Sequence, residues 1–168
     1  NSDRAVSAEF ARLARSLFGL ELNTWAYEHS DAVRQYVSSH AMGRLLERSF
    51  HCAVGSRSAA KEVPPQIFSA SEEIKWAFLS GLFEGDAYIS VRPSHGRTAG
   101  TQAYIEYVTA SEELARQVVS LLLRLGVFGT IRRLEKCATN TVKKTKRPYW
   151  SVFVYGIWQL HRMADGLS

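Results

Sequence analysis

The hydrophobic and polar positions of the chain follow a pattern that occurs twice. Residues 7–18 (SAEFARLARSLF) resemble residues 111–122 (SEELARQVVSLL), with apolar side chains at matching positions. Each segment starts at a serine and is followed by a glycine, Gly19 in the first case and Gly126 in the second. Serine is a preferred residue at the start of a helix, and glycine is preferred just after its end. Both segments are therefore predicted to be helices.

A second pair of similar segments follows in the same order. Residues 35–42 (QYVSSHAM) align with residues 152–159 (VFVYGIWQ), and in each case a strand pattern turns into a helix. The first pair is offset by 104 residues and the second by 117, so 13 additional residues fall between two strands of the second copy. The chain is expected to hold one full repeat and the C-terminal part of a preceding repeat.

Between the two copies, Pro64 and Pro65 predict an extended linker over residues 63–68. The chain is thus expected to divide into residues 1–68, the first copy with the linker, and residues 69–168, the second copy. The second copy is predicted to run helix, two strands, helix, two strands, helix, which is an α+β fold. Its elements are expected at residues 71–85, 87–92, 101–109, 111–125, 130–134, 149–155 and 157–165.

Composition and charge narrow the class of protein. The 168 residues are 46% hydrophobic and 22% charged, which excludes a disordered or fibrous protein. No apolar run approaches the roughly 18 residues of a membrane span, so a soluble, cytoplasmic protein without a membrane partner is expected. The net charge is +5, but residues 132–147 alone hold seven basic residues and one acid. This concentration favours a polyanionic partner, and a solvated loop is the alternative.

The predicted helix at 71–85 carries the first candidate chemistry. Ala77, Gly81 and Gly85 are spaced four residues apart, so one side of the helix has almost no side chains and a second helix could pack closely there. Asp86 follows at the C-terminal end, where the helix dipole is already negative. A divalent cation would relieve this repulsion, because the Asp86 carboxylate and the Gly85 carbonyl are hard oxygen ligands suited to Mg²⁺. The alternative is an ordinary turn residue after a core helix.

Residues 79–87 (LSGLFEGDA) resemble the motif that names the LAGLIDADG homing endonucleases, and their surroundings are similar to those in the intein-encoded branch of that family. The resemblance extends over essentially the whole chain, including the KEVP segment at 61–64 and the helix predicted at 111–125. It implies that each αββαββα repeat contributes strands to a DNA-binding β-saddle. It also implies that the small-residue face of Ala77, Gly81 and Gly85 packs against the motif helix of the other repeat.

The same resemblance implies a metal-dependent endodeoxyribonuclease. Asp86 would be one of a pair of acids that hold Mg²⁺ ions, with the Gly85 carbonyl beside it, and the ions would help a water molecule to hydrolyse a phosphodiester. Lys61 lies where similar intein endonucleases carry a basic residue thought to assist by polarising the water or stabilising charge on the phosphate. A solvated surface lysine is the alternative for Lys61. Ala87, where the family motif usually has glycine, is a mild departure.

The predicted DNA contacts lie on the strands that follow the motif helix. The strand at 87–92 alternates in character, which places Tyr88, Ser90 and Arg92 on one face. Together with Arg132 on a later strand, they are candidates for groove contacts, since arginine reads guanine through paired donors. The polar face of any half-solvated sheet is the alternative. Phosphate contacts are expected instead from the basic residues of the inserted loop, Lys143, Lys144, Lys146 and Arg147.

A first motif helix with its own acid is not found in the sequence. The segment that carries it is expected from the same parent chain, from a partner chain or from a second copy of this chain. The expected function is that of a site-specific homing endonuclease domain of an intein, which cleaves double-stranded DNA. The main alternative is a catalytically inactive DNA-binding module, as in transcription regulators that reuse the fold, and RNA binding as in related maturases is another.

Overall fold

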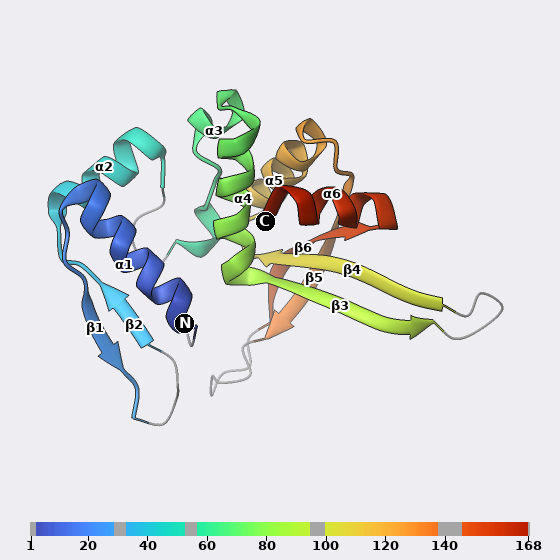
Figure 1. The fold of residues 1–168 in the computed structure, drawn as a ribbon, viewed down its shortest axis with the longest axis horizontal. Coiled ribbons are helices and arrows are strands. Elements are labelled where there is room, and N and C mark those ends of the chain that lie inside the picture. Colours follow the sequence, from blue (N-terminus) through green and yellow to red (C-terminus); the bar gives the residue numbers. More distant parts are fainter. Residues whose placement is uncertain (1–2, 29–32, 53–56, 95–99, 138–145, 168) are drawn as a thin grey trace. The chain divides into compact units, whose positions relative to one another are not determined.

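The chain forms two compact units, Asn1–Gly43 and Arg44–Ser168 (Figure 1). Among the described helices, none has both the length and the apolar character that a membrane span requires. The structure, a computed structural model, describes residues 3–28, 33–52, 57–94, 100–137 and 146–167.

The first unit consists of one helix followed by an antiparallel hairpin. Helix α1 (Arg4–Phe18) leads into β1 (Asn23–Ala26), which pairs with β2 (Val33–Tyr36). Helix α2 (His40–Phe50) begins in this unit and ends in the second. Among the described residues of the first unit, Ala14 alone is buried. The order helix, strand, strand, helix is that of the second half of the repeat.

Helix α1 starts earlier than the sequence pattern predicted. The residue that caps it is Asp3 and not Ser7, since the Asp3 carboxylate accepts hydrogen bonds of 2.7 and 3.2 Å from the backbone of Ala5 and Val6. The first-copy helix therefore includes one additional turn, and the serine that aligns with Ser111 lies inside it. Gly19 ends the helix with φ of 64°, the left-handed conformation that glycine adopts without strain.

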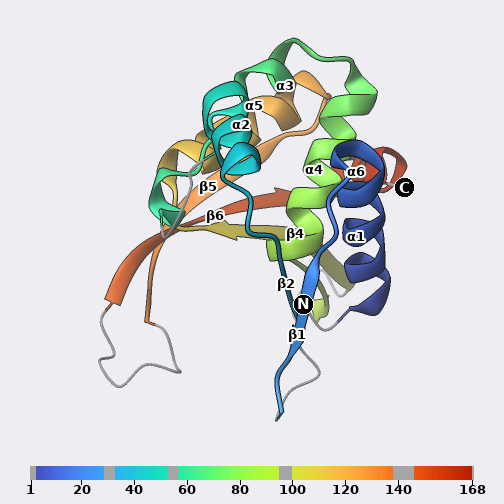
Figure 2. The ribbon, with the colours of Figure 1, turned by 90° about the vertical axis from the view of Figure 1, so that its left-hand side faces the viewer.

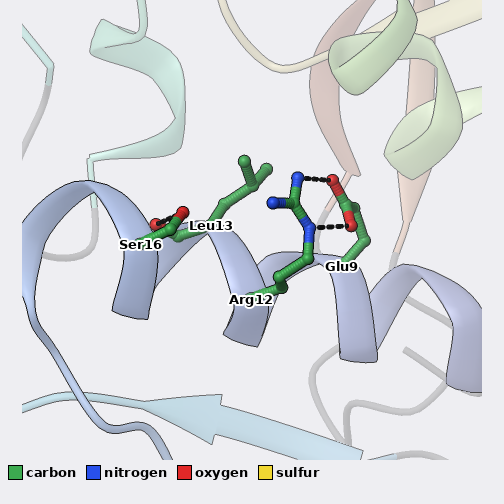
Figure 3. A network of polar contacts seen from close by, with 4 residues as sticks. All are labelled: Glu9, Arg12, Leu13 and Ser16. Atoms are coloured by element: carbon green, nitrogen blue, oxygen red, sulfur yellow. Dashed lines mark hydrogen bonds and ion pairs between the residues drawn. The ribbon is translucent and has the colours of Figure 1, made fainter.

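The exposed side of α1 carries a two-bond ion pair (Figure 3). Arg12 donates two hydrogen bonds of 2.7 Å each to the carboxylate of Glu9, and Ser16 Oγ donates to the Leu13 carbonyl at 3.4 Å. The Arg12 guanidinium lowers the pKa of the Glu9 carboxyl. Exposed pairs of this kind add little to stability, so α1 depends on its caps and its apolar side chains.

The second unit has the element order predicted for the full repeat. A four-stranded antiparallel sheet has the strand order β3-β4-β6-β5, and α4, α5 and α6 lie on one side of it (Figures 1 and 2). The elements of this unit are η1 (Ser58–Ala60), α3 (Pro65–Ser69), α4 (Glu72–Asp86), β3 (Ala87–Ser94), β4 (Gly100–Thr109), α5 (Glu112–Arg124), β5 (Gly129–Cys137), β6 (Lys146–Tyr155) and α6 (Ile157–Leu167).

The core of the second unit lies between the sheet and the three helices. Apolar residues alternate along β4 and β6, and those on the helix side are buried at 9% exposure or less; they are Ile105, Tyr107, Val152 and Val154. Side chains of the helices fill the other half of this core, and they include Leu79, Phe83, Val118, Leu121, Leu122 and Met163. Every second residue of these strands and the apolar stripe of each helix therefore pack against each other in one core layer.

Two serine caps are confirmed. Ser71 Oγ accepts from the backbone N–H of Ile74 at the start of α4, and Ser111 Oγ accepts from that of Leu114 at 3.1 Å at the start of α5. Each cap satisfies one of the backbone donors that the first turn of a helix leaves without an internal partner. Gly126 follows α5 with φ of 79°, which confirms glycine at the helix end.

The predicted extended linker is wrong over part of its length. Pro65 begins a short helix, α3, because proline at the first helical position lacks only an N–H that would have had no partner in the helix. Val63 is 2% exposed and donates its N–H to Gln117 Oε1 at 2.6 Å, so the segment is packed against α5. Residues 44–68, which the sequence pattern assigned to the first copy and linker, thus belong to the second compact unit.

Candidate functional site

Asp86 is the last residue of α4, as the sequence predicted, and it is exposed. Trp76, Leu79 and Phe83 face the core at helical spacing and hold the helix in place. The Phe83 ring stacks on Tyr107 of β4 with centroids 5.3 Å apart, next to the point where Ala87 pairs with Tyr107. The end of α4 is therefore anchored to the sheet, which fixes where the backbone presents Asp86.

Tyr107 is the buried neighbour of this acid. It is 1% exposed, and burial raises the pKa of its phenol to about 12, with the negative charge of Asp86 contributing in the same direction. A hydrogen bond with the Thr109 side chain acts in the opposite sense. The phenol therefore stays protonated at neutral pH. It places a neutral polar group, and not a second charge, beside the end of α4.

The backbone at Lys61 is held at the same end of the sheet. Its carbonyl accepts a hydrogen bond of 2.6 Å from Ser111 Oγ, and the Ser111 N–H donates to Thr109 Oγ1 at 3.1 Å. Since Thr109 ends β4 and Ala87 pairs with Tyr107 two residues earlier, Lys61 and Asp86 flank the same strand end. Residues 25 positions apart in sequence are thus brought to one region, and the Lys61 side chain is exposed there.

The side of α4 that carries Ala77, Gly81 and Gly85 is exposed. A Cβ atom added to Gly81 or Gly85 would meet nothing within 4 Å. Contacts within the described residues therefore do not explain why glycine stands at these positions. Packing of this face against a second helix stays a prediction.

The described residues offer at most part of a metal site at the end of α4. Among the residues that the structure describes, no group of three or more His, Cys, Asp and Glu side chains could hold a metal ion. The Asp86 carboxylate and the carbonyls of the last turn of α4, Gly85 included, are hard oxygen donors of the kind that Mg²⁺ prefers. The donor chemistry fits this ion, but Mg²⁺ takes six ligands. The others would have to be water, phosphate oxygens or a second acid.

The sheet of the second unit has one face that its helices leave uncovered, called the open face below. Strand register assigns the residues to it: Tyr88 pairs with Glu106, Glu106 with Phe153, and Ser151 with Arg132. The predicted contact residues Tyr88, Ser90, Arg92 and Arg132 therefore share this face, as expected. Register also places on this face Gln102, Tyr104, Glu106, Val108, Thr130, Leu134, Lys136, Arg147, Tyr149, Ser151, Phe153 and Tyr155.

Aromatic rings form the middle of the open face. Phe153 stacks on Tyr155 with centroids 5.5 Å apart, and Tyr104 contacts both rings at 5.8 and 5.7 Å. The Arg132 guanidinium lies over the Phe153 ring at 5.2 Å, a cation–π geometry, and the residue remains exposed. A positive group is thus held in place on an aromatic surface.

Ser90 differs from its expected role. Tyr88 and Arg92 lie on either side of it along β3, and the Arg92 guanidinium beside the Tyr88 phenol lowers the pKa of that phenol. Ser90 between them is 1% exposed. Contact between Ser90 and a ligand would require Tyr88 and Arg92 to move apart, so these two residues are the accessible ones.

The phosphate contacts predicted for the inserted loop are only partly described. Lys146 and Arg147 begin β6, are exposed, and pair in register with Cys137 and Lys136 at the far end of β5. Lys143 and Lys144 lie outside the described residues.

Sequence reasoning missed several residues of the open face. Tyr104 and Glu106 alternate with Ala103, Ile105 and Tyr107, so the pattern of β4 contained the signal. The pattern of β4 could not show which residues lie beside Tyr104 and Glu106, because the pairing of β4 with β6 is set by the strand order of the sheet.

A match to a known family decides the identity of this arrangement. The LAGLIDADG-like domain family matches residues 73–163, from the first turn of α4 to α6. The chain belongs to the LAGLIDADG family. The mixed α+β fold predicted from the sequence is therefore confirmed, and α4, which carries the LAGLIDADG-like segment 79–87 and ends at Asp86, lies within the matched residues.

Relatives of this LAGLIDADG chain have unrelated names. It is 33% identical over 129 residues to an uncharacterized protein of Methanocaldococcus jannaschii, covering 77% of this chain and 13% of the relative. It is 33% identical over 124 residues to a DNA gyrase subunit of Mycolicibacterium flavescens, covering 74% of this chain and 21% of the relative. With an ATP-dependent DNA helicase of Thermococcus kodakarensis, 35% identity extends over 61% of this chain and 9% of the helicase. The chain thus spans about a fifth or less of these relatives.

Among solved structures, an archaeal intron-encoded homing endonuclease complexed with DNA is similar to this chain. The similar region covers 58% of this chain and 55% of the endonuclease chain. The TM-score is 0.39 and the sequence identity 17%.

Proposed function

We propose that this chain is part of a site-specific homing endonuclease that cleaves double-stranded DNA with the help of Mg²⁺. The observation that carries the proposal is the LAGLIDADG helix itself. It ends in an exposed acid, Asp86, at the border of a sheet whose open face presents arginine and aromatic side chains. An acid that can bind a metal and a surface that can bind DNA are the two parts that a metal-dependent nuclease requires.

The open face suits duplex DNA. The major groove admits a β-ribbon, and arginine in it can bind guanine through two donors. Arg92 and Arg132 are held on this face by neighbouring aromatic residues, while Lys146 and Arg147 extend the positive charge along β6. Arg92 is held by a hydrogen bond with Tyr88 and Arg132 by the Phe153 ring, and such fixed arginines suit base edges. The lysine at the strand end suits phosphate.

Asp86, with the Gly85 carbonyl, would hold Mg²⁺ at the border of that face. The bound ion would supply an activated water and stabilise the leaving oxygen of the phosphodiester. Lys61 would stabilise charge on the phosphate from the same strand end, where Ser111 holds its backbone. The remaining acid would come from the LAGLIDADG helix of a first repeat, packed against Ala77, Gly81 and Gly85. That repeat would belong to the same parent chain, to a partner chain or to a second copy of this chain.

The names of the relatives support an intein as the source. A DNA helicase and a DNA gyrase subunit are different enzymes by name, yet each is similar to this chain over a small share of the enzyme's own length. A segment common to otherwise different enzymes is what an inserted element would leave. On this proposal the match reflects the insert and not the enzyme that carries it.

The experiment compares Asp86→Asn with Glu84→Gln in the protein that carries this chain. Glu84 is an exposed acid two residues earlier on α4, so its variant removes the same charge at nearly the same place. Asp86→Asn should lose more than about a hundredfold in cleavage with Mg²⁺, beyond the loss known for outer-shell partners of metals. Binding to the same duplex should change little. Glu84→Gln should keep both.

Two outcomes would contradict this assignment. Full cleavage by Asp86→Asn would exclude Asp86 as a metal ligand. Specific binding by the unmodified protein without cleavage in Mg²⁺ would favour the alternative function, a DNA-binding module or transcription regulator that keeps the fold without the chemistry.

A further inference from the structure

The open face carries one carboxylate among its described residues, Glu106, near the centre of the sheet. In register it stands between Tyr88 of β3 and Phe153 of β6. Glu106 is half-buried, and its Oε1 accepts a hydrogen bond of 2.7 Å from Ser151 Oγ. An acid is unexpected at the centre of a surface whose other charged residues, Arg92, Arg132, Lys136 and Arg147, are all basic.

Ser151 fixes the direction of this carboxylate. Ser151 is fully buried at 0% exposure, so its hydroxyl requires a partner inside the protein, and Glu106 is that partner. An ionised carboxylate has about four acceptor sites. The hydrogen bond from Ser151 on the neighbouring strand therefore orients the Glu106 carboxylate. The carboxylate can still accept hydrogen bonds from a donor that approaches the open face.

The chemistry of the carboxylate selects the donor. In a complex with DNA, the phosphates would repel Glu106, and an acid that is desolvated without a donor is costly. The donors that the major groove offers are the exocyclic amines of cytosine and adenine. Adenine places the N7 acceptor beside its amine, and an acceptor there repels a carboxylate, whereas the cytosine edge presents the N4 amine as its hydrogen-bonding group. Cytosine is thus the base that Glu106 fits.

We propose that Glu106 is a specificity-determining residue that accepts a hydrogen bond from the N4 amine of a cytosine in the duplex target. Ser151 is the positioning residue that holds the carboxylate toward that base. This inference rests on the proposed function, since it requires the open face to lie in the major groove of DNA.

The test is selection of bound sites from a randomised DNA duplex library by the full chain and its variants. The unmodified chain should enrich cytosine at one position of the site. Glu106→Gln should shift that position toward adenine by at least about fivefold, because a glutamine amide both donates to N7 and accepts from N6. Glu135→Gln is the matched control, since Glu135 pairs with Pro148 on the opposite face of the same sheet. It removes the same charge and should leave the base preference unchanged.

Two further variants separate readout from a structural role. Glu106→Asp keeps the charge and should keep the preference for cytosine with weaker discrimination. Ser151→Ala should weaken discrimination at the same base pair and leave the other positions of the site as they were. A structural role alone would lower affinity for all sequences evenly.

The results separate a failure of the role of Glu106 from a failure of the proposed function. If Glu106→Gln, folded by circular dichroism, enriches the same site as the unmodified chain or weakens every position equally, Glu106 does not read a base and the proposed function stands. If the unmodified chain enriches no duplex sequence, DNA recognition by this chain fails and the role of Glu106 fails with it.

Discussion

The hairpin of the first unit and the hairpin β5–β6 of the second each hold an aromatic ring at a matching position of the sequence repeat. Asn23 pairs with Tyr36 in β1–β2, and Thr130 pairs with Phe153 in β5–β6. Tyr36 and Phe153 also align in the sequence repeat. In each hairpin an arginine lies over this ring, Arg34 at 5.9 Å from the centroid and Arg132 at 5.2 Å. The two copies therefore share a ring beneath a guanidinium, but Arg34 lies on the same strand as its ring and Arg132 lies on the neighbouring strand.

The surroundings of the two hairpins differ. Phe153 is 9% exposed because β4 adds Tyr104 beside it, whereas Tyr36 is 44% exposed and Trp25, on the same face, is 62% exposed. Within its own unit, β2 pairs with β1 and with no other described strand. The register of a hairpin follows from its own residues, but burial of its side chains needs the strands and helices of a whole repeat. The LAGLIDADG helix with its acid belongs to that larger part, which only the second copy shows.

The largest effect on stability is expected at a helix contact of the second unit, since the first unit buries only Ala14 among its described residues. A Cβ atom on Gly166 of α6 would overlap the ring of Trp76, which is buried on α4. Gly166→Ala should therefore lower the free energy of unfolding by about 1–3 kcal/mol, as overpacked cores do. Urea denaturation followed by tryptophan fluorescence and circular dichroism measures this loss.

Gly43→Ala is the matched control for that variant. Gly43 is also helical, but a Cβ atom there would meet nothing within 4 Å, so alanine should raise stability by up to about 1 kcal/mol. Equal effects of the two variants would show that α6 does not pack on α4 as described.

A second, smaller effect concerns pH and Tyr107. The pKa of its phenol is raised from 10 to about 12 by burial, so the folded protein holds this proton more tightly than the unfolded chain does. The stabilisation is complete below pH 10 and is lost as the pH rises toward about 12. The unfolding midpoint of the second unit should therefore fall over this interval, and Tyr107→Phe should flatten that part of the curve. An unchanged slope in Tyr107→Phe would mean that another group causes the loss.

Local signals in the sequence predicted much of the second unit. Ser71 and Ser111 predicted helix starts, and Gly126 a helix end, because each acts on its own turn of backbone. Alternation along β3 predicted which side chains share a face. The helix expected at residues 71–85 placed Asp86 at its C-terminal end, and that position is confirmed.

What the sequence could not show depends on contacts between distant residues. Ser151 and Glu106 are 45 residues apart and meet only because β4 and β6 are neighbours. Lys61 reaches the end of β4 through a bond with Ser111, 50 residues away. The burial of Ser90 depends on how Tyr88 and Arg92 orient, which alternation does not specify. Such features are set by sheet order and side-chain packing.

The smallest effect would show whether the longer hairpin of the second copy adds phosphate contacts. Its strands extend to Lys146 and Arg147, whereas β1–β2 carries Arg34 as its one basic residue among those described. Each phosphate that a protein neutralises contributes about 0.9 to the slope of log affinity against log salt. Replacing Lys146 and Arg147 by alanine should lower that slope by up to about 1.8 without changing the preferred sequence, and Arg34→Ala should lower it by at most about 0.9. Lys75→Ala is the control, since Lys75 belongs to α4 and to neither hairpin, and it donates to the Ala70 carbonyl. Salt titrations of each variant on a selected duplex measure the slopes, and an unchanged slope in the Lys146 and Arg147 variant would mean that the extended strand end is solvated and does not touch DNA.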